Sequence, residues 1–161
     1  MSFQLRPRTA LHLARLGLFT ALYVAAPAHA SPIDENIPDA QTLAQMEIRA
    51  SQASPREQCF LYTALVHTMT EMAGQEIRAG DTEHAADTLK QISRYANLIH
   101  ASLAKETRHL KEAEMLLNHT SYRLGQLLHI VPSEDKTTVQ STLNQLDQVN
   151  DEVLTQVFYH Y

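Results

Sequence analysis

Cysteine, tryptophan and glycine are scarce in this sequence: of 161 residues, one is cysteine, none is tryptophan and four are glycine. Because Cys59 has no second cysteine in the chain, neither an intrachain disulfide nor a C-x-x-C-H haem attachment can form. The sequence also lacks a G-x-S-x-G nucleophile elbow, a glycine-rich phosphate loop and a paired catalytic carboxylate pattern. We therefore expect a non-enzymatic protein that has no cofactor and is stabilised by packing.

The first 30 residues differ from the rest of the chain because they include basic residues but no acidic ones. Arg6, Arg8 and Arg15 come before the apolar run LGLFTALYVAA, which is followed by Ala28-His29-Ala30. This order is typical of a secretory signal peptide, and 11 apolar residues are too few to span a bilayer, which takes about 20. We expect cleavage after Ala30, a periplasmic or secreted location, and no stable membrane insertion after cleavage.

The chain that follows residue 30 is acidic. Without the three arginines of the signal peptide, 10 basic residues oppose 18 acidic ones, a formal net charge of −8. Phosphate backbones repel such a protein, so we expect no nucleic-acid partner. Residues 31–38, SPIDENIP, have two prolines and no periodicity and predict a flexible lead-in. Residues 39–161 are expected to form a single helical domain.

Capping residues mark most of the expected helix boundaries. Asp39 can cap a first helix, and Ser54-Pro55-Arg56-Glu57 predicts a reciprocal capping box at the start of the second. Gly80 can end that helix with positive φ, and Pro132 with Ser133 precedes the last one. The helices expected from these signals are 39–52, 55–79, 82–131 and 134–159.

The segment 82–131 contains no proline, and its apolar residues keep one helical phase. The stripe runs from Ala85 to Val131 in alternating steps of four and three, and only Glu106 and Thr120 interrupt it. This spacing predicts an all-α fold of long antiparallel helical hairpins that share one long central helix, 82–131. A break near 105–108, which gives an up-down four-helix bundle, is the alternative.

The stretch SLAKETRHLKEAEML raises the question of a metal site. Glu106 and His109 have the Glu-x-x-His spacing that places both side chains on one helix face, and the antiparallel pairing brings His160 towards them. A site of Glu106, His109 and His160 is one hypothesis. The other, which we favour, is that Glu106 is a charged residue in a helix seam and is neutralised by Arg56.

A second group of residues has ligands suited to copper. His67, Glu71, Met69, Met72, Met115 and His119 supply imidazole, carboxylate and thioether groups. The favoured interpretation is that Met69 and Met72 fill the core and that His67 and Glu71 form a surface pair. His84, His119 and His129 lie off the apolar stripe and are expected to be exposed.

Cys59 lies beside Phe60 and Tyr62 on the apolar face of its helix. Because no C-x-x-C partner or activating histidine is close in sequence, we expect a buried, inert thiol. An intermolecular disulfide is the alternative.

Two resemblances bear on function. The turn Gly80, Asp81, Ala85, Leu89, Ile92 resembles the inner turn of a tetratricopeptide hairpin, but no second copy follows one 34-residue period away. The stretches EQCFLYTALVHTMTEMAGQ and LNQLDQVNDEVLTQVF, with the signal peptide, resemble exported all-helical bacterial proteins, a resemblance that implies no activity. We predict an exported module that binds itself or another exported protein; the alternative is a small periplasmic protein that binds copper, zinc or iron.

Overall fold

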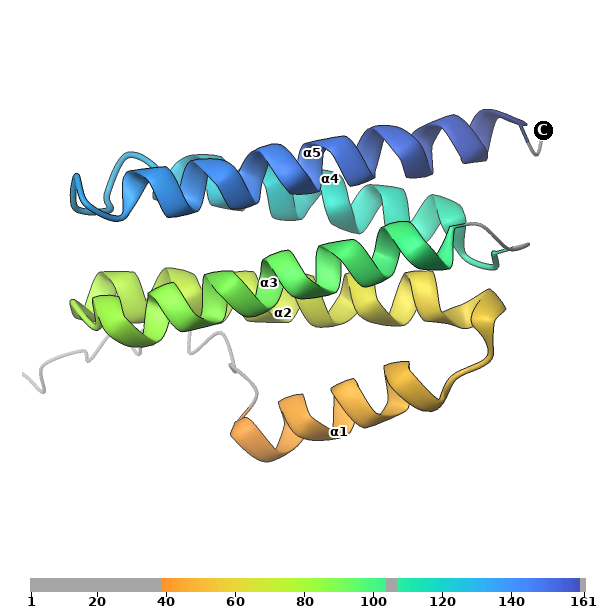
Figure 1. Ribbon diagram of the computed structural model, residues 1–161, viewed down its shortest axis with the longest axis horizontal. Coiled ribbons are helices and arrows are strands. Elements are labelled where there is room, and N and C mark those ends of the chain that lie inside the picture. The colour runs from red at the N-terminus through yellow and green to blue at the C-terminus, as the bar shows by residue number, and fades with distance from the viewer. Residues whose placement is uncertain (1–38, 104–106, 160–161) are drawn as a thin grey trace, which may run out of the picture. The chain divides into compact units, whose positions relative to one another are not determined.

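Five helices make up the described part of the chain, which comprises residues 39–103 and 107–159 of the computed structural model. All five belong to one compact unit, and the expectation of an all-α fold built from helical hairpins is confirmed. None of the described helices is long and apolar enough to cross a membrane. In chain order they are α1 (Ala40–Gln52), α2 (Pro55–Ala79), α3 (Thr82–Ser102), α4 (Leu110–Leu127) and α5 (Lys136–Tyr159) (Figure 1).

Two of the expected caps, at Asp39 and Gly80, are present. The Asp39 carboxylate accepts a hydrogen bond from the backbone N–H of Thr42 at 2.7 Å, and Gly80 ends α2 with a φ of 77°. The capping box at Ser54 is not formed as predicted, because the Ser54 hydroxyl bonds the Glu57 carboxylate at 3.1 Å and no side chain caps the backbone there. Helix α2 nevertheless begins at Pro55, whose missing N–H needs no partner.

Two antiparallel hairpins, α2–α3 and α4–α5, stack on each other (Figure 1). Helix α4 packs on α2 and α5 packs on α3, each pair running parallel, because hydrogen bonds join residues 52 or 53 positions apart. Examples are His67 with Thr120 and Leu103 with Gln156. Helix α1 packs mainly on α2, and its Glu47 forms a side-chain hydrogen bond with Tyr95 of α3. The two hairpins therefore bury their apolar faces against each other.

The prediction of a continuous helix over 82–131 is wrong, and the alternative of a break near 105–108 is correct. Helix α3 ends at Ser102, α4 begins at Leu110, and residues 107–109 are not helical. His109 has a φ of 59°, a left-handed conformation that histidine adopts more readily than most residues. The Arg108 N–H donates to the Arg56 carbonyl at 2.7 Å, which ties the connection to the start of α2.

The apolar stripe that suggested one helix forms the core of the two helices that replace it. Except for Glu106, which lies outside the described residues, every position of the stripe is buried. Leu103 and Leu110 belong to the same core although the chain reverses between them. The buried positions are Ala85, Leu89, Ile92, Ala96, Ile99, Leu103, Leu110, Ala113, Leu117, Thr120, Leu124, Leu127 and Val131.

Candidate functional site

Aromatic and charged side chains gather along the outward side of the α2–α4 contact, which we call the outer seam. Three side-chain pairs define it. The rings of Phe60 and His109 lie 5.4 Å apart between centroids, and those of His67 and His119 lie 5.2 Å apart. The third pair is Glu71 with Arg123, which form an ion pair. The outer seam therefore places two aromatic contacts and one ion pair along two parallel helices.

The centre of the outer seam holds a group of three metal-ligand side chains. One ligand atom from each of His67, Glu71 and His119 lies within 4.8 Å of the other two. His67 and Glu71 share a face of α2 because they are four residues apart, and His119 comes from α4. His67 and Glu71 are half-buried, whereas His119 is exposed. The group is therefore accessible from solvent through the α4 side.

Hydrogen bonding fixes the proton position on His67. The Thr120 hydroxyl donates to the Leu116 carbonyl at 2.7 Å, which uses its only proton. Its oxygen lies 3.1 Å from Nδ1 of His67 and can only accept there. With the hydroxyl proton on the Leu116 carbonyl, Nδ1 of His67 carries a proton, and in the neutral ring the other nitrogen, Nε2, has the lone pair. Thr120, the polar residue that interrupts the apolar stripe, is thus buried in contact with this imidazole.

Glu71 is held in its charged form by Arg123. The guanidinium donates from Nε at 2.7 Å and from Nη2 at 2.5 Å to the two carboxylate oxygens. These hydrogen bonds lower the pKa of Glu71 more than its partial burial raises it. Glu71 thus forms an ion pair between two helices and also interacts electrostatically with His67, with which the sequence pairs it.

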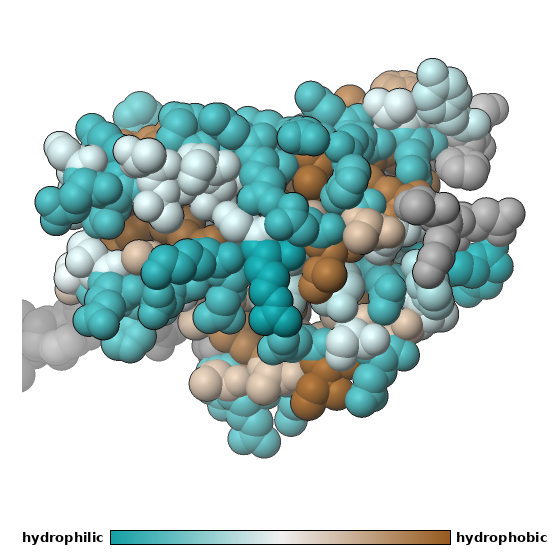
Figure 2. Space-filling model, viewed as in Figure 1, coloured by the Kyte–Doolittle hydropathy of each residue, from teal (hydrophilic) through white to brown (hydrophobic). Residues whose placement is uncertain are grey.

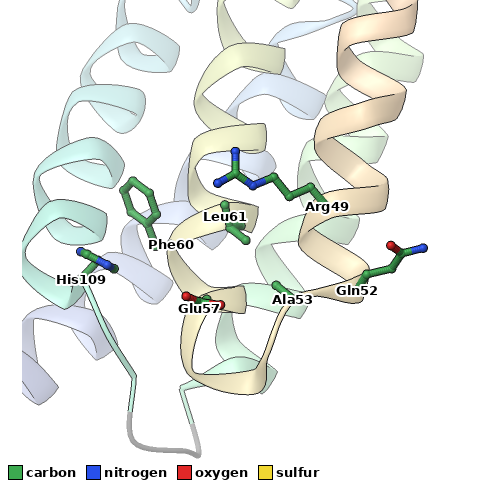
Figure 3. Close-up of a pocket in the computed structure, with 7 residues that line it drawn as sticks. All are labelled: Arg49, Gln52, Ala53, Glu57, Phe60, Leu61 and His109. Carbon is green, nitrogen blue, oxygen red and sulfur yellow. The ribbon is translucent and has the colours of Figure 1, made fainter.

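One end of the outer seam opens into a cavity of about 390 Å³ (Figure 3). Phe60 and Leu61 supply apolar surface from α2, Arg49 comes from α1, and His109 comes from the residue before α4. Glu57 adds a carboxylate at the first turn of α2. The cavity thus combines apolar surface with one basic and one acidic group.

The site predicted around Glu106 is not the one that the described residues assemble. Glu106 and His160 lie outside the described residues, so that site stays a prediction. His109 is the N-cap of α4, and the predicted helix face shared with Glu106 is wrong because residues 107–109 are not helical. Its Nδ1 lies 3.7 Å from the Glu112 carboxylate.

The copper hypothesis included three of the residues that do come together. His67, Glu71 and His119 are adjacent, while Met69 is buried in the core, as expected, and Met115 is 61% exposed. His84, His119 and His129 are exposed, and Cys59 is buried, both as predicted. Neither Arg123 nor the contact of Thr120 with His67 was predicted from the sequence. The sequence feature that could have indicated this contact is Thr120 itself, a polar residue in an apolar stripe.

Comparison with protein-family models, with curated proteins and with solved structures finds no match for this chain. The outer seam and the surface beside it are therefore the basis for the proposals that follow.

Proposed function

We propose that this protein is a non-enzymatic helical module that self-associates through the outward surface of α4. The observation that carries the proposal is a pair of large side chains, Met115 and Tyr122, which are 61% and 63% exposed. They lie seven residues apart, two helical turns, and therefore share one face of α4. We call this surface the α4 strip; its residues are Met115, Asn118, His119, Tyr122 and Gln126.

The α4 strip has the composition of a protein interface. Between residues 115 and 133 the only Asp, Glu, Lys or Arg is Arg123, in a chain of which 19% is charged. That guanidinium is turned to Glu71 and does not interrupt the strip. Interface centres are depleted in charge and enriched in Met and Tyr. By contrast, hydrophilic residues cover much of the α3 and α5 face (Figure 2).

A second copy of the chain is the partner that fits this surface. The whole sequence has a net charge of −5, so two copies repel unless they meet through a neutral patch. A two-fold axis across α4 places one neutral strip against another, and two-fold dimers are the commonest oligomers. Tyr122 and Met115 then bury apolar surface that the monomer leaves in water.

Sedimentation velocity over a range of protein concentrations tests self-association. We expect a reversible dimer, and we expect Met115→Glu with Tyr122→Glu to weaken it by about tenfold or more, because four carboxylates then meet at the two-fold axis. The matched control is Gln91→Glu with Thr137→Glu, which adds the same charge on α3 and α5. A wild-type protein that stays monomeric, or a dimer equally sensitive to both pairs, contradicts the proposal.

We further propose that the module acts outside the cytoplasm. The support is the basic, then apolar, then Ala28-His29-Ala30 order of residues 1–30. Intact mass of protein recovered from the cell envelope should correspond to a chain that starts at Ser31. Recovery of the uncleaved chain in the cytoplasm contradicts this proposal.

A further inference from the structure

We infer that His67, Glu71 and His119 form a binding site for one borderline divalent cation, of which Zn²⁺ is the representative. The inference does not require self-association, because the three ligands lie on α2 and α4 of a single chain, although His119 also belongs to the α4 strip. It rests on three contributions: the proximity of the ligand atoms, the fixed proton on His67 and the fixed orientation of Glu71.

The proximity of the three ligands is close to what coordination requires. In a tetrahedral zinc site with bonds of about 2.1 Å, neighbouring ligand atoms lie about 3.4 Å apart. The three ligand atoms here lie within 4.8 Å of one another, so rotations of side chains can close the site while the helices stay in place. Water can supply the fourth ligand, because His119 is exposed.

Two neighbours prepare the ligands. Thr120 accepts the Nδ1 proton of His67, the arrangement by which proteins orient metal-binding imidazoles and set their tautomer. Arg123 donates a hydrogen bond to each carboxylate oxygen of Glu71 and so fixes the plane of the carboxylate. Each carboxylate oxygen has two lone pairs, so the ion pair with Arg123 leaves one on each oxygen for a metal.

The donor set selects the class of ion. Two imidazole nitrogens and one carboxylate oxygen suit Zn²⁺, Cu²⁺ or Ni²⁺, whereas Ca²⁺ and Mg²⁺ prefer oxygen ligands alone. The single thiol, Cys59, is not part of the group, so nothing here favours a soft ion such as Cu⁺. Arg123 cancels the charge of Glu71, and we therefore expect weaker binding than in cysteine-rich zinc sites.

Titration calorimetry with Zn²⁺ on tag-free, chelator-treated protein tests the inference. We expect one ion per chain, with an affinity that falls by about tenfold or more in His119→Ala and in Glu71→Gln. His119 is exposed, so its removal should leave the fold intact, which circular dichroism checks. His129→Ala removes another exposed histidine and should bind Zn²⁺ like the wild type.

A second variant tests the positioning role of Thr120. Thr120→Val keeps the shape of a buried side chain but removes the acceptor for His67, and it should weaken Zn²⁺ binding by about tenfold. The visible absorption of bound Co²⁺ should keep its tetrahedral pattern in that variant and disappear in His119→Ala. No heat with the wild type, or equal affinity in His119→Ala and His129→Ala, overturns the inference. Retained Zn²⁺ binding in Met115→Glu with Tyr122→Glu separates it from self-association.

Discussion

Arg123 of α4 and Glu71 of α2 form a two-point ion pair across the outer seam, with donor–acceptor distances of 2.7 and 2.5 Å. The residues are 52 positions apart in sequence, and the carboxylate is 16% exposed. The ion pair therefore joins the second hairpin directly to the first. It also keeps a charged carboxylate beside two histidines at the centre of the outer seam.

The first prediction concerns the stability that this ion pair contributes. Glu71→Gln and Arg123→Met, made singly and together, form a double-mutant cycle. We expect a coupling free energy of about 1 kcal/mol, because the pair is bidentate but only partly shielded from water. Urea unfolding followed by circular dichroism measures it. A coupling free energy near zero would show that the pair does not hold the hairpins together.

The second prediction concerns the left-handed residue at the start of α4. His109 has a φ of 59°, a conformation that asparagine tolerates and a β-branched residue does not. His109→Val should therefore unfold about 1–2 kcal/mol more easily than His109→Asn. Both variants lose the ring contact with Phe60, so the comparison isolates the backbone. Equal stabilities would mean that position 109 is not left-handed in solution.

Helix ends marked by local chemistry were predictable from the sequence, whereas the chain reversal was not. The helix boundaries at Asp39, Pro55 and Gly80 depend only on residues a few positions away, so the local sequence is enough to predict them. The reversal falls between Leu103 and Leu110, which are seven residues apart. Seven residues make two helical turns. The two leucines therefore keep the same helical spacing whether the chain continues as one helix or breaks between them.

The candidate site shows the same limit at longer range. That His67 and Glu71 share a face of α2 follows from their spacing. Their partners on α4 come from about 50 residues away and depend on parallel stacking of the two hairpins. A continuous central helix would have placed Arg123 beyond the N-terminal end of α2, out of reach of Glu71. Because the central helix was predicted to be continuous, the contacts of His67 and Glu71 with α4 could not be predicted.

The third prediction compares two glycines. Gly80 has a φ of 77°, so Gly80→Ala should cost about 1 kcal/mol of stability. Gly125 lies inside α4, and a Cβ there would meet no atom within 4 Å. Gly125→Ala should stabilise the fold by about 0.5–1 kcal/mol, because alanine favours the helix. Chemical unfolding of both variants measures these two opposite changes in stability. A loss of stability in Gly125→Ala would contradict the prediction.

The fourth prediction concerns Cys59, whose thiol is fully buried. Burial raises its pKa to about 11, while a hydrogen bond with Ser102 acts in the opposite direction. The unfolded chain releases this proton near pH 8.5, so the unfolded state gains the thiolate first as pH rises. The stability that the neutral thiol contributes is therefore complete below about pH 8.5 and is lost as pH rises towards 11.

Cys59→Ala isolates that contribution, because every other titrating group stays in place. The difference in unfolding free energy between wild type and variant should be constant below about pH 8.5, and it should shrink by at most about 1.4 kcal/mol per pH unit above it. Denaturant unfolding in a series of buffers under reducing conditions measures the difference. A difference that does not change between pH 8 and 10.5 would mean that the thiol ionises in the folded protein as readily as in the unfolded chain. Cys59 would then be accessible to water and open to the intermolecular disulfide that its burial otherwise prevents.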